Sequence, residues 1–332
     1  MPQGSLLGPL LFIIFIKDLP SALPDGSIAA LYADDTKLFS SILSYLDAVN
    51  LQQALTNLDS WSLHNNINFN ALKCKALSVT RKKNPVRYDY HLGQADLQRV
   101  NGEEDLGVII TSKLTWETQV LMVSARANKL LGLLRRTCPM LTDVKVRRSL
   151  YLALVKSQMS YATEVWSPSH STLKQKAERV QRRATRWILQ IKQGELSYKE
   201  RLIHLDLLPL TYDREVKNLV FLYKALYGHI DIDISFIKSV SHGRSRRSQS
   251  SDIKYLETPL CKTATYQSSF FNRSIKLCNL ICKLIRPCDF LNIKTFKNSI
   301  TNLFKDELAN VFDPDKPCSW GLARSCGCHW QQ

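Results

Sequence analysis

The chain has 332 residues, 45% of them hydrophobic and 22% charged, which excludes a disordered, fibrous or collagen-like protein. Its 45 lysines and arginines against 29 acidic residues give a formal net charge of +16, which favours a polyanionic partner. The charge is uneven, because residues 126–192 hold fifteen basic and three acidic residues, a net charge of +12. This concentration indicates a nucleic-acid-binding segment, and a solubilising surface is the alternative.

The cysteine content and the apolar runs bear on the compartment. Nine cysteines follow no regular spacing, and a chain of this length needs no disulfides to fold, so we expect a reducing intracellular location, cytoplasmic or nuclear. The apolar run from Leu6 to Ile16 has no basic residue before it and no small-residue cleavage site after it, unlike a signal peptide. It is also too short to cross a bilayer. We therefore expect no membrane segment and no secretory partner.

The first predicted elements are a helix and a hairpin. Residues 6–22 form an apolar helix that we expect to be buried, with Ser5 as its N-cap and Pro20 closing it. Residues 28–39 then place β-capable flanks around a tight acidic turn, which predicts a β-hairpin with Asp34 and Asp35 at its tip. Two carboxylates there suit a hard divalent cation such as Mg²⁺, which takes oxygen ligands. An ordinary Asp-Asp turn is the alternative.

Two motifs carry a resemblance to a known family. Tyr32-Ala33-Asp34-Asp35 resembles the catalytic motif of reverse transcriptases, and Pro2-Gln3-Gly4-Ser5 resembles the motif that precedes it in that family. Their order and spacing are similar to those of non-LTR retrotransposons of the jockey and CR1 type. The resemblance implies that Asp34 and Asp35 are catalytic and bind Mg²⁺ or Mn²⁺. It also implies substrate-binding roles for Pro2, Gln3, Gly4, Ser5, Tyr32 and Ala33.

The resemblance also indicates what is missing from the sequence. Polymerases of this family carry further motifs before the Pro-Gln-Gly motif, including a strand with another metal-binding Asp, and none of these precedes Pro2 here. We therefore expect an N-terminally truncated reverse transcriptase.

The next segment combines a helix with a short strand. Residues 45–64 show leucines at helical spacing, and residues 65–80 predict a loop that enters a strand at 76–79. The turn that holds Asn70 resembles the next polymerase motif, and Lys73 takes the place of the family's lysine. The resemblance implies that Lys73 protonates the departing pyrophosphate as a general acid. A solvated surface lysine is the alternative.

Residues 87–110 alternate in hydropathy and predict two or three short antiparallel strands. Asp105-Leu106-Gly107-Val108, together with Leu114-Thr115-Trp116, resembles the family's hairpin that grips the primer end. We expect this hairpin to end the palm.

Residues 117–193 predict three amphipathic helices with breaks near Pro139 and Pro168. The resemblance implies that they form the thumb. The third helix carries six basic residues that we expect to follow a phosphate backbone, the four arginines along one exposed face. They are Lys174, Lys176, Arg179, Arg182, Arg183 and Arg186.

Past these helices the sequence predicts one or two further helices over 198–228, ending at Gly228, and an exposed loop over 239–251. Residues 266–304 resemble the closing block of the retrotransposon proteins. In the tail, four potential zinc ligands are Cys318, Cys326, Cys328 and His329. The close spacing of the last three makes shared tetrahedral coordination awkward, so we expect a disordered tail, and a zinc site is the alternative.

The predicted fold class is α+β, the C-terminal half of a right-hand polymerase palm followed by a mainly helical thumb and C-terminal region. The predicted divisions are 1–112 for the palm, 113–235 for the thumb, 236–315 for the C-terminal region and 316–332 for the tail. The resemblance implies a fragment of an RNA-directed DNA polymerase, acting on an RNA template and a DNA primer. Without the upstream Asp we expect the fragment to be inactive alone. The alternatives are a non-catalytic, sequence-nonspecific nucleic-acid-binding module and a transposon relic.

Overall fold

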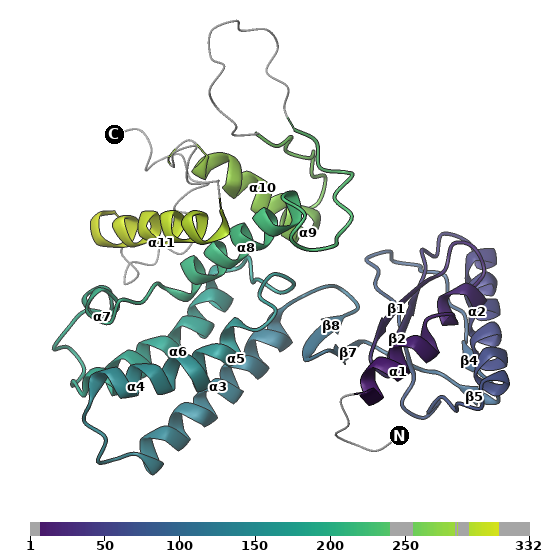
Figure 1. Ribbon diagram of the computed structural model, residues 1–332, viewed down its shortest axis with the longest axis horizontal. Coiled ribbons are helices and arrows are strands. Elements are labelled where there is room, and N and C mark those ends of the chain that lie inside the picture. The colour runs from purple at the N-terminus through teal and green to yellow at the C-terminus, as the bar shows by residue number, and fades with distance from the viewer. Residues whose placement is uncertain (1–6, 240–254, 283, 285–291, 312–332) are drawn as a thin grey trace, which may run out of the picture. The chain divides into compact units, whose positions relative to one another are not determined.

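The computed structural model describes residues 7–239, 255–282, 284 and 292–311 (Figure 1). The chain forms two compact units. Unit 1 comprises residues 1–105 and 109–115, and unit 2 comprises residues 106–108 and 116–332. Ser5 and the tail cysteines lie outside the described residues.

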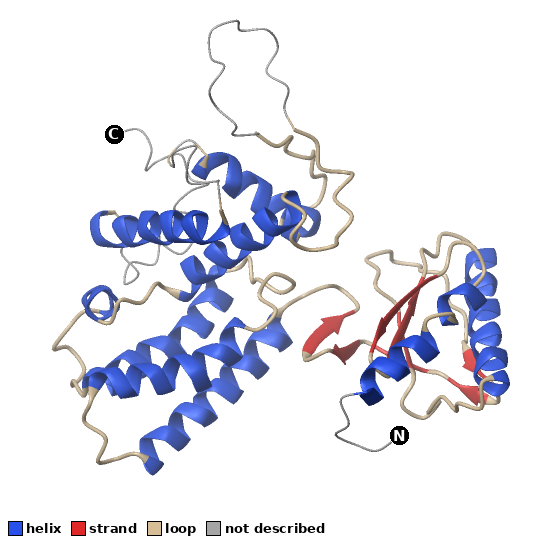
Figure 2. Ribbon diagram, viewed as in Figure 1, coloured by secondary structure: helices blue, strands red, loops and turns tan. Residues whose placement is uncertain are grey.

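Unit 1 mixes short strands with two helices, and Figure 2 shows the strands among its coils. Its elements are α1 (Leu7–Ile16), the 3₁₀ turn η1 (Leu19–Ala22), β1 (Ile28–Tyr32), β2 (Asp35–Phe39), α2 (Tyr45–His64), β3 (Lys75–Leu77), β4 (His91–Leu92), β5 (Ala95–Asp96), β6 (Gln98–Val100) and β7 (Gly102–Asp105), with β8 (Val108–Thr111) following the turn that joins it to β7. The predicted mixture of helices and strands, an α+β fold, is confirmed.

The strands pair two by two. β1 pairs with β2 and β4 with β5, both antiparallel, and β7 pairs with β8. The antiparallel pairing expected after residue 87 is present in β4 and β5. β3 pairs with β6 in parallel, so the expectation is wrong for β6. The reason is that the chain between β3 and β6 is long enough for a crossover connection, which returns β6 in the same direction as β3.

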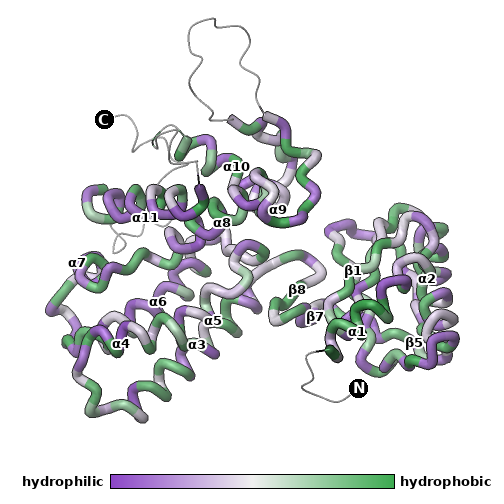
Figure 3. The backbone as a smooth tube through the Cα atoms, in the orientation of Figure 1, coloured by the Kyte–Doolittle hydropathy of each residue, from purple (hydrophilic) through white to green (hydrophobic). Residues whose placement is uncertain are grey.

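Helix α1 differs from its prediction. It is shorter than expected, and only Ile16 is buried in it, although the helix is hydrophobic along its whole length (Figure 3). Phe15 packs against Trp61 of α2 with ring centroids 6.2 Å apart. Leu7, Leu10 and Ile13 stay more than half exposed, because no described element covers the other faces of α1. The expectation of a buried helix is therefore wrong for the described residues.

Helix α2 forms as predicted. A capping box fixes its N-terminus, and Gln52 joins it to β4. Ser44 accepts a hydrogen bond from the Asp47 N–H, and the Asp47 carboxylate accepts one from the Ser44 N–H, which makes a capping box. Gln52 exchanges two hydrogen bonds with the backbone of His91, at 2.9 and 3.0 Å, and so joins α2 to β4.

Unit 2 is helical over most of its described residues. Its elements are α3 (Glu117–Thr137), α4 (Val144–Leu150), the π-helical segment η2 (Tyr151–Lys156), α5 (Ser157–Ser160), α6 (Ser171–Leu189), α7 (Tyr198–His204), α8 (Leu210–Leu226), α9 (Ala264–Gln267), α10 (Phe270–Ile281) and α11 (Ile293–Asn310). The three predicted helices and their breaks are confirmed, with α4, η2 and α5 consecutive in the second. Gly228 follows α8 with a φ of +69°, a conformation that suits glycine after a helix.

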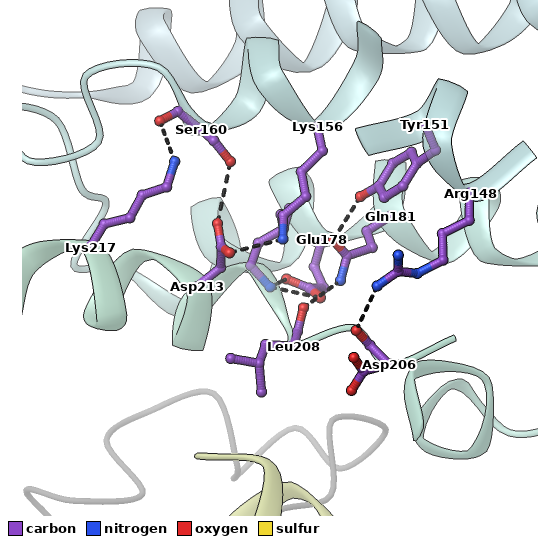
Figure 4. Close-up of polar contacts among 11 residues, drawn as sticks. Arg148, Tyr151, Lys156, Ser160, Glu178, Gln181, Asp206, Leu208, Asp213 and Lys217 are labelled. Atoms are coloured by element: carbon purple, nitrogen blue, oxygen red, sulfur yellow. Dashed lines mark hydrogen bonds and ion pairs between the residues drawn. The ribbon is translucent and has the colours of Figure 1, made fainter. Parts of the chain in front are cut away.

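A buried polar network joins η2, α6 and α8 inside unit 2 (Figure 4). The Tyr151 hydroxyl donates to Gln181 Oε1 at 2.7 Å, and Gln181 Nε2 donates to the Leu208 carbonyl at 2.9 Å. Lys156 forms an ion pair with Asp213 at 2.8 Å. These contacts hold the inward face of α6, which carries Gln181, against η2 and the segment before α8.

Within the described residues, no helix has both the length and the apolar character that crossing a membrane requires.

Candidate active site and nucleic-acid interface

The predicted hairpin is confirmed as β1 and β2. Five residue pairs run from Ile28 opposite Phe39 to Tyr32 opposite Asp35, which leaves a two-residue turn of Ala33 and Asp34. Asp34 therefore lies in the turn and Asp35 opens β2, so the two carboxylates stand at the tip, as the sequence predicts.

The turn contains a strained residue. Ala33 has a φ of +52°, in the left-handed region that residues with a side chain seldom adopt. This conformation costs on the order of 1 kcal/mol, which the five-pair ladder of β1 and β2 offsets. Strain of this kind is common at functional sites, and here it sets the direction in which the chain presents Asp34.

Both carboxylates are exposed at the surface of unit 1. Among the described residues, neither Asp34 nor Asp35 has a hydrogen-bonding or ion-pairing partner. Tyr32, across the ladder from Asp35, is 66% exposed. Because the carboxylate oxygens of Asp34 and Asp35 make no hydrogen bond or ion pair with other described protein groups, they are available to bind a hard divalent cation, which prefers oxygen ligands.

The set of ligands is incomplete in the described part of the chain. No group of three His, Cys, Asp or Glu side chains is close enough there to hold a metal ion. The hairpin thus offers two carboxylates and no third.

A second carboxylate-bearing strand lies beside the hairpin. Alternation along β2 places Lys37 on the same face as Asp35, and Lys37 forms an ion pair with Asp105 at the end of β7. The turn after Asp105 holds Leu106 and Gly107, with φ of +46° and +81°. Two successive positive φ values are typical of a tight type I′ hairpin turn, so the hairpin predicted from Asp105 to Val108 is present.

Of the other predicted catalytic and substrate-binding residues, Tyr32 and Ala33 belong to the hairpin itself. Lys73 is exposed after the turn in which its N–H bonds the Asn70 carbonyl at 3.0 Å. Its ammonium group makes no hydrogen bond or ion pair with any residue that the structure describes, so its role stays a prediction. Pro2, Gln3, Gly4 and Ser5 lie outside the described residues.

Three of the predicted nucleic-acid-binding arginines form a stripe on α6. Arg179 and Arg183 are exposed, and Arg186 is half-buried one turn further along. Arg183 Nη1 donates to Asn128 Oδ1 of α3 at 3.2 Å. Arg179, Arg183 and Arg186, called the α6 stripe below, therefore run along the edge of α6 that borders α3.

The other three basic residues of α6 are engaged by neighbours. The expectation of four exposed arginines is wrong for Arg186 and Arg182, which are half-buried. The Arg182 guanidinium carbon lies 4.2 Å from the ring centroid of Tyr198. The reason is that α7 places Tyr198 against it. Burial lowers the pKa of Lys174, and Glu215 opposes that effect. Lys176 pairs with Glu117 of α3 at 3.7 Å.

Sequence reasoning missed two contacts of these sites. The alternation of β2 could have shown that Lys37 shares a face with Asp35. Its partner Asp105 is 68 positions further along the chain and carries no local signal. Asn128 was equally hidden, because only the packing of α3 on α6 brings it to Arg183.

Comparison with known proteins bears on the class. Residues 1–100 match the family model described as reverse transcriptase (RNA-dependent DNA polymerase). Those residues contain β1 and β2 with Asp34 and Asp35. No solved structure matches the chain.

Three polymerases of Drosophila transposable elements are similar to this chain. The chain is 29% identical over 200 residues to a probable RNA-directed DNA polymerase from transposon BS of Drosophila melanogaster, covering 57% of this chain and 22% of that protein. It is 28% identical over 179 residues to the RNA-directed DNA polymerase from mobile element jockey of Drosophila funebris, covering 50% and 19%. A similar match, 24% over 196 residues, covers 57% of this chain and 21% of a probable RNA-directed DNA polymerase from transposon X-element of Drosophila melanogaster.

The chain is thus related to reverse transcriptases. More particularly, it is similar to the RNA-directed DNA polymerases of jockey-like non-LTR retrotransposons, so the resemblance predicted from the two motifs is confirmed. It spans about a fifth of the length of these relatives.

Proposed function

We propose that this chain is a segment of an RNA-directed DNA polymerase of a non-LTR retrotransposon. The observation that carries the proposal is the pair of exposed, unpartnered carboxylates of Asp34 and Asp35 at a strained hairpin tip, within the segment that matches reverse transcriptases. Unit 1 would be the C-terminal half of the palm, and unit 2 the thumb with the C-terminal region.

In the proposed reaction a DNA primer is extended on an RNA template. Asp34 and Asp35 would hold Mg²⁺ or Mn²⁺, which when bound supplies positive charge at the attacking and leaving oxygens. Pro2, Gln3, Gly4, Ser5, Tyr32 and Ala33 would position the nucleotide and template. Lys73 would donate a proton to the departing pyrophosphate.

We further propose that residues 1–332 are inactive on their own. Two-metal transfer needs a carboxylate cage around both ions, and in the described residues no three His, Cys, Asp or Glu side chains are close enough together to hold one. Losing about 4 kcal/mol of metal-mediated stabilisation corresponds to roughly a thousandfold in rate. Primer extension on poly(rA)/oligo(dT) with Mg²⁺ or Mn²⁺ should therefore stay at background. Extension that disappears in an Asp34→Asn variant would show that two carboxylates suffice.

Metal binding at the hairpin can be tested without activity. We expect a weak Mn²⁺ site, measured by the loss of the free-ion signal in electron paramagnetic resonance, that disappears in the Asp34→Asn, Asp35→Asn double variant. Asp25→Asn is the matched control, because Asp25 is an exposed aspartate in the turn before β1. A metal site at the hairpin would be contradicted if Asp25→Asn abolished Mn²⁺ binding as fully as the double variant, or if the double variant still bound Mn²⁺ like the parent.

A second proposed activity is sequence-nonspecific binding of an RNA–DNA hybrid by the α6 stripe. The observation that favours it is the exposure of Arg179 and Arg183 in a segment with a net charge of +12. Cations on a helix face neutralise phosphates and release counterions, so affinity should fall steeply with salt and depend little on sequence.

Fluorescence anisotropy of a labelled hybrid at several salt concentrations tests this activity. Replacing Arg179, Arg183 and Arg186 with Ala should weaken binding on all sequences and flatten the log–log salt slope by up to about three contacts' worth. Replacing Lys262, Lys294 and Lys297 with Ala removes the same charge from other exposed sites of unit 2 and should change the slope much less. Equal effects of the two triple variants would mean that only net charge matters.

A further inference from the structure

Three tyrosines form a cluster at the surface of unit 1. The rings of Tyr45 and Tyr88 have centroids 5.5 Å apart, and those of Tyr88 and Tyr90 are 5.1 Å apart. Tyr45 is the first residue of α2 and remains 64% exposed, so most of its ring stays in water. The rings are tilted to one another, by 56° between Tyr45 and Tyr88 and by 43° between Tyr88 and Tyr90. Tyr88 and Tyr90 are half-buried, so the Tyr45 ring offers the most accessible aromatic face of the cluster.

The cluster rests on a fixed backbone. Arg99 of β6 donates from Nη2 to the Tyr88 carbonyl at 2.6 Å and from Nη1 to Ser78 Oγ at 2.6 Å. The Leu97 N–H bonds the Tyr90 carbonyl at 2.8 Å. These bonds hold the backbone carbonyls of Tyr88 and Tyr90 in place, and the 5.1 Å between the two ring centroids puts both rings on one side of the segment.

The charge around the cluster is positive. Residues 81–99 contain five basic and two acidic residues. The side chains of Arg81, Lys82, Lys83 and Arg87 are exposed just before Tyr88. Basic residues beside aromatic rings that reach the surface are a combination by which proteins bind single-stranded nucleic acid, with phosphates on the cations and bases on the rings.

We infer that Tyr45, Tyr88 and Tyr90 form a stacking platform for unpaired bases of a single-stranded nucleic acid, whose phosphates run along the basic residues 81–87. This inference rests on the proposed nucleic-acid partner and adds to it a second site with a different specificity. Bases inside a duplex are already stacked, so the tyrosine platform recognises the single strand, whereas the α6 stripe recognises the phosphates of the hybrid.

The test uses the full chain and two labelled probes, a twelve-nucleotide oligouridylate and an RNA–DNA hybrid, in fluorescence anisotropy. Tyr45→Ala should weaken binding of the single strand at least about fivefold, leave its salt slope unchanged because no charge is removed, and leave hybrid binding unchanged. Tyr45→Phe keeps the ring and should bind like the parent. Tyr266→Ala removes a tyrosine that is 52% exposed in unit 2 and should have no effect.

Several outcomes overturn the platform. It fails if the parent does not bind the single strand, if Tyr45→Ala binds it like the parent, or if Tyr45→Ala weakens hybrid binding equally, since that would indicate loss of structure. If the α6 triple variant loses the hybrid while Tyr45→Ala changes nothing, the platform alone is wrong. If Tyr45→Ala loses the single strand while the α6 triple variant keeps the hybrid, the platform stands and the α6 assignment fails.

Discussion

Glu178 is a carboxyl buried in unit 2 where α6 meets the start of α8 (Figure 4). It accepts hydrogen bonds from the Tyr198 hydroxyl and from the Leu210 N–H, the latter at 3.1 Å. Burial raises its pKa from an ordinary value of 4.5 to about 7, although the hydrogen bond from Tyr198 acts in the opposite sense. Because Glu178 is buried in the core of unit 2, its protonation affects the stability of the fold and plays no part in the proposed reaction.

The raised pKa predicts how stability depends on pH. Between pH 4.5 and about 7 the folded state keeps the Glu178 proton and the unfolded state loses it. The contribution of the Glu178 proton to the free energy of unfolding is therefore fully present below pH 4.5 and is lost as the pH rises through 7. Relative to a Glu178→Gln variant, whose side chain does not titrate, the parent's unfolding free energy should fall by up to about 3 kcal/mol over this range.

Urea denaturation at pH 5 and pH 8 measures this difference. Glu200→Gln is the control, because Glu200 is exposed in a capping box and its pKa is lowered by its hydrogen bonds to Ser197. That carboxyl stays ionised over the whole range, so its loss should not alter the slope. The same pH dependence in the parent and in Glu178→Gln would refute a buried protonated Glu178.

At the scale of single elements, helix α2 shows how a local signal fixes a boundary. The Ser44 hydroxyl accepts a hydrogen bond from the Asp47 N–H in the first turn of the helix, and the Asp47 carboxylate accepts those from the Ser44 and Leu43 N–H groups just before it. Replacing an N-cap serine with alanine costs about 1 kcal/mol. We therefore expect Ser44→Ala to raise hydrogen-exchange rates of α2 amides by about fivefold.

Ser41→Ala is the matched control for the cap. Ser41 is exposed three residues earlier and takes no part in the capping box. The control should leave α2 exchange unchanged. A Ser44→Ala variant that exchanges like the control would mean that tertiary packing, and not the cap, sets where α2 begins.

The elements that the sequence predicts correctly are those whose signals are local. Helices α2, α3 and α6 were predictable because apolar spacing and breakers are local. The hairpin with Asp34 and Asp35 was predictable for the same reason, since its acidic turn and β-capable flanks are contiguous. Pairing of β3 with β6 was not, because it joins segments about twenty residues apart through a crossover.

Placement of side chains in the sites was harder to predict than the elements. Helical spacing alone puts Arg182 close to Arg179 and Arg183, but the position of Tyr198 depends on how α7 packs. The burial of α1 could not be read either, since an apolar helix is buried only if another element covers it. In both cases the outcome depends on how elements distant in the sequence pack together, which the local sequence does not encode.

For the whole molecule, the two units differ in how much apolar surface they bury. Six of the buried apolar side chains lie in unit 1, and the far larger remainder lies in unit 2. Those of unit 1 are Ile16, Leu19, Ala48, Ala54, Leu58 and Leu92. Among the described residues of unit 1 no sheet has more than two strands, and two-stranded sheets are marginally stable alone.

This difference predicts unequal protection from hydrogen exchange. Because burial of apolar surface is the main favourable term in folding, amides of unit 1 should exchange faster than those of α3, α6 and α8. The exposed leucines of α1 and the open edges of β1 and β2 should also make unit 1 prone to association at higher concentration.

Hydrogen exchange followed by mass spectrometry, on monomer isolated by size exclusion, resolves the two units separately. A variant with Leu10→Glu and Ile13→Glu should reduce association without slowing the exchange of unit 1, because both side chains are already exposed. Leu219→Ala, inside unit 2, is the contrasting change and should speed exchange there by opening a cavity in a packed core. Strong and uniform protection across both units of the monomer would mean that the few buried residues of unit 1 suffice, and that the exposed face of α1 is no weakness of its fold.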